Sequence, residues 1–347
     1  MNPAISLILK QGLAPEHAFG VVSCADELDQ RYKQLLVQVH PDKNPDHRKE
    51  ADEASAVLSV LLEEAKKRLS AGVYGKPDAK ITKTEVKIGK VVYEVTGKIA
   101  KGAVSNVYSA VDADGKEYIL KVGVDPKYNS LLEHDANVGS ELRNSATKEL
   151  RSFFPKIAAT TKINGRVAIL HEKAIRRYIT AEDLLSKFPS GVPEVHVAWI
   201  FNRMLTLLTE AYKLGYIHGA ISLRHILVCP DDHTVKLLDW KYATKIGTKV
   251  STIDSTCKED LPPELPVTKL SDPATDIYML AKCMLRLLDG TSGKQNSTVS
   301  AQIRSFFNGC LVGKAYRIAD PSKLFFIFKD VIHTYLKWPK QFHILKI

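Results

Sequence analysis

Three short stretches of this 347-residue chain combine residue types and spacing that could do chemistry. The first is His40-Pro41-Asp42, in a polar loop between two stretches with helical periodicity. The second is a turn rich in small residues at 97–108, where Gly102 could let backbone N–H groups approach a phosphate closely. The third is Lys121, which interrupts the apolar strand-like run 118–122, where a lysine needs a partner for its charge. The second stretch is compatible with a phosphate ligand, although an ordinary hairpin turn uses the same small residues.

The two stretches that flank His40 are predicted to form helices. Asp26 can cap a helix that runs to Val39. A second helix is expected from about Arg48 to Leu69. The apolar residues recur at three- and four-residue steps and are Leu28, Tyr32, Leu35, Leu36 and Val39 in the first helix and Ala54, Val57, Leu58, Leu61, Leu62, Ala65 and Leu69 in the second. Two such stripes joined by a short polar loop predict an antiparallel helical hairpin.

The loop His40-Pro41-Asp42-Lys43-Asn44, placed between these helices, resembles the J-domain of DnaJ-type co-chaperones over about residues 14–70. Ala18-Phe19-Gly20-Val21 stands where that family has its first short helix. The resemblance implies that His40, Pro41 and Asp42 signal ATP hydrolysis to a DnaK-type chaperone. It also implies that a basic helix face with Arg31 and Lys33 docks on the acidic surface of that chaperone. A purely structural alternative is that Pro41-Asp42 stops one helix and caps the next.

From about residue 84 the pattern changes to short strand-like runs. Polar and apolar residues alternate on both sides of Gly89, which predicts a hairpin that turns there. The small-residue turn at 97–108, followed by Lys121 in the next strand, resembles the protein-kinase pattern in which a strand lysine pairs with ATP phosphates. Kinases hold that lysine with a helix carboxylate. The candidates are Glu133, Asp135 and Glu141, and the sequence does not choose among them.

Further stretches match the kinase family in the expected order. An amphipathic helix at 197–211 leads into His218-Gly219-Ala220, which resembles the start of the catalytic loop, His-Arg-Asp. Asp239 stands where kinases carry the aspartate of Asp-Phe-Gly. The remaining matches are Pro262-Pro263-Glu264 for Ala-Pro-Glu, Asp276 at the start of the central helix, and Arg317 for the arginine that pairs with that glutamate. Together the matches span about residues 84–335.

The same loop departs from the family at the residues that carry catalysis. Ala220 stands at the position of the catalytic aspartate and offers no proton acceptor. His225 replaces the metal-binding asparagine, and an imidazole suits Mg²⁺ poorly. Gly219 replaces the loop arginine, so ordinary kinase activity is not expected. The resemblance still implies that Gly102, Lys121 and Asp239 could hold ATP, with Mg²⁺ on Asp239.

Two alternatives to these roles stay open. Lys121 and Asp239 could simply pair with neighbouring side chains in a folded scaffold. Asp231 and Asp232 could be substitute bases, but their run 229–233 is more typical of a turn between two strands.

Composition limits the partners and the setting. The formal charge of +10 favours acidic partners, but no nucleic-acid motif accompanies it, so we expect no nucleic-acid partner. No apolar run approaches about 18 residues, so no membrane span is expected. Five scattered cysteines without a CxxC pair favour a reducing, cytoplasmic setting over a disulfide framework. The first ten residues resemble mature sequence and not a signal peptide.

The sequence therefore predicts an α+β multidomain chain. A small all-α helical-hairpin J-domain is expected at 1–70, a linker at 71–83, and a bilobal protein-kinase-like fold with its N-lobe at 84–170 and its C-lobe at 171–347. The predicted function is a co-chaperone or adaptor that stimulates a DnaK-type chaperone, while the catalytically impaired kinase-like domain binds a client protein or senses nucleotide. The alternative is an active atypical protein kinase or nucleotidyl transferase that uses ATP.

Overall fold

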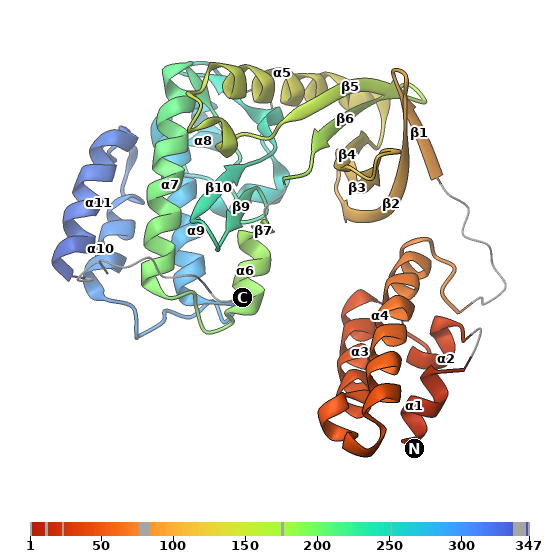
Figure 1. The fold of residues 1–347 in the computed structure, drawn as a ribbon. Coiled ribbons are helices and arrows are strands. Elements are labelled where there is room, and N and C mark those ends of the chain that lie inside the picture. Colours follow the sequence, from red (N-terminus) through yellow and green to blue (C-terminus); the bar gives the residue numbers. More distant parts are fainter. Residues whose placement is uncertain are drawn as a thin grey trace. The chain divides into compact units, whose positions relative to one another are not determined.

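The computed structural model describes residues 2–10, 13–22, 24–75, 84–174, 177–250, 252–335 and 345. Most of the predicted linker, 71–83, and of the basic tail at 338–347 lies outside these residues. By its internal contacts the chain divides into two compact units, Met1–Lys121 and Val122–Ile347. Both helices and antiparallel strands contribute to the fold (Figure 1). None of the described helices has the length and apolar character needed to cross a bilayer.

The first unit begins with four helices, α1 (Pro3–Ile8), α2 (Pro15–Phe19), α3 (Ala25–Val39) and α4 (Arg48–Ser70). α3 and α4 pack side by side as an antiparallel pair (Figure 1), which confirms the predicted helical hairpin. Leu28 and Leu58 are fully buried between them. The other buried apolar residues of this core are Ile5, Ile8, Phe19, Val22, Val39, Ala51, Ala54, Leu61, Leu62 and Ala65. Burial of each large apolar side chain contributes about 1.5–3 kcal/mol, so the two stripes determine how the helices pair.

The starts of two helices differ from the expectation. Cys24 is the N-cap of α3, so the prediction that Asp26 caps this helix is wrong. Asp26 lies in the first turn, where a negative charge still favours the helix because the N-terminal end carries a partial positive charge. The sequence patterns did not predict α1. Its signals are Asn2, whose Oδ1 accepts a hydrogen bond from Ala4 N at 2.9 Å, and Pro3 at the first helical position.

The segment after α4 is tied back to α2 by polar contacts. Glu16 Oε1 accepts hydrogen bonds from Arg68 Nε at 2.8 Å and from Gly75 N at 3.1 Å, and both side chains of this ion pair are largely buried. The Tyr74 hydroxyl donates to Gly20 O at 2.9 Å. Burial, together with the Glu16 carboxylate, raises the pKa of Tyr74 to about 12. The chain therefore stays attached to the helical part as far as Gly75.

Four strands follow in sheet order: β1 (Thr84–Ile88), β2 (Val91–Lys101), β3 (Ser105–Val111) and β4 (Glu117–Gly123). β1 and β2 pair antiparallel, from Ile88 opposite Val91 to Thr84 opposite Val95. Gly89, between them, has φ 62°, a conformation that glycine adopts without strain. The hairpin predicted at Gly89 is therefore confirmed. β2 and β3 form a second antiparallel hairpin.

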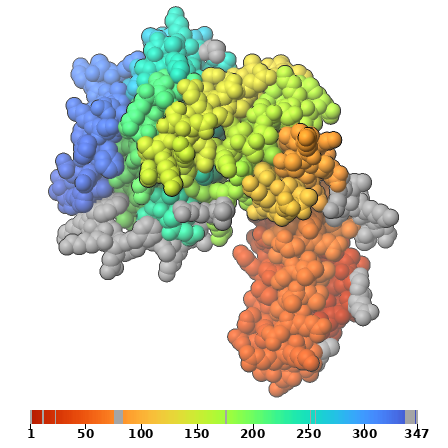
Figure 2. Space-filling model, turned by 45° about the horizontal axis from the view of Figure 1, so that its top comes forward, coloured from red at the N-terminus to blue at the C-terminus, as the bar shows by residue number. Residues whose placement is uncertain are grey.

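The second unit holds a larger apolar core around α7 (Glu194–Lys213) and α9 (Pro273–Asp289). The helix predicted at 197–211 is thus present and longer than expected. α5 (Asn129–Ser145) buries Leu132 and Leu142 and leaves a polar face at the surface, in yellow in Figure 2. The other elements are β5 (Ile157–Ile163), β6 (Arg166–Glu172), β7 (Ile179–Thr180), α6 (Ala181–Lys187), β8 (Tyr216–Ile217), β9 (Ile226–Cys229), β10 (Thr234–Leu237), β11 (Thr244–Lys245), α8 (Leu265–Thr268), α10 (Ala301–Gly309) and α11 (Pro321–Tyr335).

Short antiparallel pairings join the strands of this unit. β5 pairs with β6 from Ile157 opposite His171 to Ile163 opposite Arg166. β9 lies between β10 and β7, and β11 pairs with β8. The pairing of β9 with β10 and the pairing of β8 with β11 bring the loop between β8 and β9 close to the segment between β10 and β11.

A buried ion pair joins two segments that are far apart in the sequence. The fully buried side chain of Arg317 donates from Nη1 to Glu264 Oε1 at 2.7 Å, so the pairing predicted for these two residues is confirmed. The guanidinium also donates to Ala274 O at 3.1 Å and to Val312 O at 2.9 Å. These contacts hold the segment before α8 against the start of α9.

Replacing Glu264 with alanine would leave the buried guanidinium of Arg317 without its carboxylate. We expect the free energy of unfolding of the second unit to fall by about 3–5 kcal/mol, since removal of one partner leaves an uncompensated buried charge. Urea unfolding followed by the fluorescence of the buried Trp199 and Trp240 measures the change. As a matched control, Glu259→Ala removes an exposed carboxylate and should change stability by less than about 0.5 kcal/mol. Equal effects of the two variants would contradict this account of the ion pair.

Candidate functional site

His40-Pro41-Asp42 lies in the loop between α3 and α4, as predicted. Pro41 begins a short 3₁₀ turn, and His40 precedes it in an extended conformation with φ −61° and ψ 135°. The Asp42 backbone N–H donates to His40 Nδ1 at 3.2 Å, so a neutral His40 ring carries its hydrogen on Nε2. The side chains of His40 and Asp42 are 49% and 77% exposed, so a partner protein can reach both.

Two asparagine side chains hold this loop. Asn44 Nδ2 donates to Gln38 O and to His40 O, each at 2.9 Å. Asn2 Nδ2 donates to Gln38 O at 2.9 Å and to Asn44 Oδ1 at 3.2 Å. The last carbonyl groups of a helix have no partner within the helix, so these amides satisfy them and fix the loop backbone. Sequence reasoning quoted Asn44 as part of the loop but missed this role. The signal was an asparagine directly after a turn, where its side chain commonly bonds the local backbone.

The surface of α3 is less basic than the sequence interpretation supposed. Arg31 Nη1 donates to Phe19 O at 3.1 Å, and its Nη2 pairs with Glu27 at 3.5 Å. Lys33 is exposed. With three acidic side chains against two basic ones, α3 has no net positive charge. The exposed basic side chains nearest in sequence to His40-Pro41-Asp42 are Lys43 and Arg48.

Gly102 lies in the turn between β2 and β3, and Lys121 lies on β4. The N–H of Gly102 donates to Ser105 O at 3.0 Å and closes the turn between β2 and β3. A Cβ atom at this position would lie 2.9 Å from the same oxygen, so the turn requires glycine. This N–H is therefore already used, and the contact is that of an ordinary hairpin turn. Lys121 is half-buried in β4, between buried Leu120 and Val122.

The three candidate carboxylates for Lys121 lie on α5 in different surroundings. Glu133 pairs with Lys162 at 3.3 Å. Glu141 accepts a hydrogen bond from the Tyr216 hydroxyl at 2.7 Å. Asp135 is the buried member of the three. The three carboxylates therefore differ in burial and in their partners.

A buried carboxylate, Asp276, holds the loop that contains Ala220. It accepts hydrogen bonds from His218 N and Gly219 N, each at 2.8 Å, and from the Tyr212 hydroxyl at 3.3 Å. Burial raises the pKa of Asp276 to about 7, although these donors act to lower it. Gly219 has φ 71°, and the side chain of Ala220 is fully buried. The position at which the resemblance places a catalytic aspartate thus holds a methyl group out of contact with water.

The ring of His218 connects this loop to the end of β10. Its Nδ1 accepts a hydrogen bond from Ala220 N at 3.2 Å, and its Nε2 lies 2.9 Å from Leu238 O. Since a carbonyl oxygen only accepts, Nε2 carries the hydrogen. Burial, with the nearby His225, lowers the pKa of His218 to about 3. His218 is therefore a neutral, structural histidine.

Asp239 and His225 come together next to Ala220. Asp239 Oδ2 lies 3.1 Å from His225 Nε2 and also contacts Lys241 Nζ. His225 Nδ1 lies 2.7 Å from Ala220 O. Asp254 completes a group in which one ligand-type atom from each of His225, Asp239 and Asp254 lies within 4.8 Å of the others. The structure thus brings together Ala220, His225 and Asp239, which the sequence singled out. It adds Lys241 and Asp254, which sequence reasoning missed.

The acidic pair Asp231 and Asp232 belongs to the turn between β9 and β10. Asp232 Oδ1 accepts hydrogen bonds from Thr234 N at 3.1 Å and from Thr234 Oγ1 at 2.6 Å. His233, with φ 52°, stacks on Trp199 with 4.3 Å between ring centroids. The preferred interpretation of this run as a turn is therefore confirmed.

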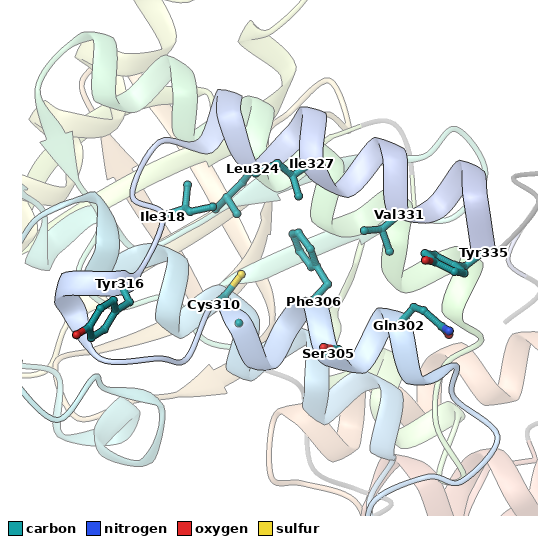
Figure 3. Close-up of a pocket in the computed structure, with 11 residues that line it drawn as sticks. Gln302, Ser305, Phe306, Cys310, Tyr316, Ile318, Leu324, Ile327, Val331 and Tyr335 are labelled. Carbon is teal, nitrogen blue, oxygen red and sulfur yellow. The ribbon is translucent and has the colours of Figure 1, made fainter.

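A groove of about 400 Å³ lies between α10 and α11 (Figure 3). Phe306, Leu324 and Val331 are among its lining residues. No charged side chain occurs among the described residues that line it. The groove lies on different elements from Ala220 and Asp239 and has no charge with which to hold a phosphate.

A scan of the sequence against protein-family models finds no match, and a search of curated proteins finds no relative.

Acid should destabilise the second unit through His218. Its pKa is about 6.5 in the unfolded chain and about 3 in the folded one. Between these values only the unfolded state binds the proton, so stability falls as the pH is lowered through this window. At pH 4 the contribution is about 3 kcal/mol. Urea unfolding between pH 7 and pH 4 should show a shallower acid dependence for His218→Phe than for the wild type.

The exposed His333 of α11 supplies the control. His333→Phe also removes an imidazole and should keep the wild-type dependence on pH. The same acid dependence in the wild type and His218→Phe would show that His218 does not remain neutral in the folded chain.

Proposed function

We propose that this protein is a co-chaperone that stimulates ATP hydrolysis by a DnaK-type chaperone through His40-Pro41-Asp42. The observation that carries the proposal is the exposed loop between two antiparallel helices, with the side chains of His40 and Asp42 open to a partner. Asn44, which follows the turn, donates to the carbonyl groups of Gln38 and His40, which precede it. A loop that is already ordered loses little conformational entropy on binding, which favours recognition. The proposed setting is the cytoplasm.

The full-length protein should accelerate ATP hydrolysis by a purified DnaK-type chaperone in single-turnover assays. His40→Gln should abolish the acceleration, because glutamine lacks the ring nitrogen that accepts the Asp42 N–H. His47→Gln changes a second histidine between α3 and α4 and should retain the activity. Circular dichroism should show the same helix content in both variants.

Two results would refute the co-chaperone proposal. One is the absence of acceleration by the intact protein. The other is an equal loss of activity in His40→Gln and His47→Gln, since the effect would then not depend on the His40-Pro41-Asp42 loop.

The rest of the chain is, in this proposal, a bilobal protein-kinase-like domain that binds a client protein or senses nucleotide without transferring phosphate. The pairing of Glu264 with Arg317 supports the resemblance, because it was expected from the family pattern. The buried methyl group of Ala220 supports the loss of activity. Phosphoryl transfer in kinases uses an aspartate at this place to accept the proton of the substrate hydroxyl.

Nucleotide sensing would use ATP, with Lys121 as the side chain that contacts its phosphates, because the N–H of Gly102 already donates to Ser105 O. ATP at about 100 times its dissociation constant should stabilise the protein by about 2.7 kcal/mol. Lys121→Met should lose most of that stabilisation, while Lys87→Met, at an exposed lysine of β1, should keep it. Thermal unfolding with and without ATP, in EDTA and in Mg²⁺, measures these differences. If ATP has no effect on the wild type, the sensing role is wrong and the co-chaperone role is untouched.

The alternative of an active atypical protein kinase or nucleotidyl transferase is less well supported. Asp232 serves the turn between β9 and β10, and Ala220 offers no base. Transfer of label from γ- or α-labelled ATP that disappears in Asp239→Ala would reverse this preference.

A further inference from the structure

The carboxylate of Asp239 already has a cation. Its Oδ2 contacts Lys241 Nζ, and the two side chains are only 13% and 8% exposed. Asp239 has a left-handed backbone, with φ 72° and ψ 54°. This backbone conformation turns the chain so that the side chain of Lys241 returns to the carboxylate of Asp239. The ion pair is therefore built into the local backbone and largely shielded from water.

A divalent metal ion would have to use the same carboxylate. The resemblance to kinases implies Mg²⁺, which requires near-octahedral oxygen ligands at about 2.0–2.1 Å. Next to Asp239 the structure offers the imidazole nitrogen of His225 at 3.1 Å. The other carboxylate, Asp254, accepts hydrogen bonds through Oδ1 from Thr256 N at 2.9 Å and Thr256 Oγ1 at 2.7 Å, so it offers a metal at most Oδ2. The residues present therefore do not fit Mg²⁺.

Charge repulsion adds to this poor fit. Two unit charges about 4 Å apart repel by about 4 kcal/mol near a protein surface, and a divalent ion doubles that cost. The ammonium group of Lys241 would have to move away, but it also lies 4.8 Å from the centre of the Tyr242 ring, a favourable cation–π position. A metal ion would displace both contacts.

We propose that the ammonium group of Lys241 takes the place of a metal ion at Asp239, so that the wild-type chain binds no divalent metal there. The proposal concerns the metal alone and is independent of the co-chaperone role. For the nucleotide role it has one consequence, since ATP would bind without Mg²⁺ at Asp239.

Removal of the ammonium group should uncover a latent metal site. His225, Asp239 and Asp254 present one ligand-type atom each within 4.8 Å of one another. His225 Nδ1 lies 2.7 Å from Ala220 O and donates its hydrogen there, so Nε2 is the nitrogen left for a metal. One imidazole with two carboxylates suits Mn²⁺ or Zn²⁺ better than Mg²⁺.

The test is a titration of Mn²⁺ into the full chain without nucleotide, with free Mn²⁺ followed by electron paramagnetic resonance. Lys241→Met keeps the length of the side chain and removes its charge, and it should bind Mn²⁺ about tenfold or more tightly than the wild type. Adding Asp239→Asn to Lys241→Met should remove the gain. Lys245→Met, at an exposed lysine whose Nζ donates to Leu214 O, should behave like the wild type.

Binding of Mn²⁺ by the wild type that Asp239→Asn abolishes would overturn the proposal. A folded Lys241→Met chain that binds Mn²⁺ no more tightly than the wild type would also overturn it. If Lys241→Met folds only when Mn²⁺ is present, the metal replaces the ammonium group and the proposal is supported. If the variant stays unfolded with Mn²⁺, the metal cannot replace the ammonium group and the proposal fails.

Discussion

The buried carboxylate of Asp276 is the constraint on which the loop around Ala220 depends. A carboxylate in the interior is costly unless hydrogen bonds compensate for the lost water, and the backbone N–H groups of His218 and Gly219 do so. Both groups can point at one carboxylate because Gly219 takes a left-handed conformation that suits glycine. His218 is thereby placed to donate to Leu238 O, immediately before Asp239. One buried carboxyl group thus organises two segments that are far apart in the sequence.

The buried loop around Ala220 is held rigidly, whereas the accessible polar side chains of interest lie in another part of the chain. Fixed polar groups are what catalysis requires, because they stabilise a transition state without reorganising. Here the fixed position next to His218 holds the methyl group of Ala220, and the nearby carboxylate of Asp239 is paired with Lys241. The exposed polar groups of His40 and Asp42 lie instead on the helical hairpin of the first unit. In the co-chaperone proposal, this exposed loop carries the signal and the buried loop around Ala220 has a structural part.

The sequence predicted the structural features that follow from the spacing of residue types or from a family pattern of paired residues. The apolar stripes of α3 and α4, the turn at Gly89 and the pairing of Glu264 with Arg317 are of this kind. Contacts that depend on backbone direction could not be predicted. Lys241 meets Asp239 only because Asp239 has positive φ, which no pattern of residue types signals. The use of the Gly102 N–H within its own hairpin was equally hidden, because a phosphate-binding turn would have the same composition.

The contacts of Tyr74 and Gly75 with the α2 region fix the chain directly after α4, at the start of the predicted linker. Since they hold residues 71–75, these residues cannot extend. An extended chain spans at most about 3.3–3.6 Å per residue, so the five residues would otherwise have added about 17 Å of reach. A shorter tether raises the effective concentration of one binding partner around another, as long as it can still span the distance between them. In the co-chaperone proposal, a chaperone at His40 would consequently be held closer to any client that the same chain binds.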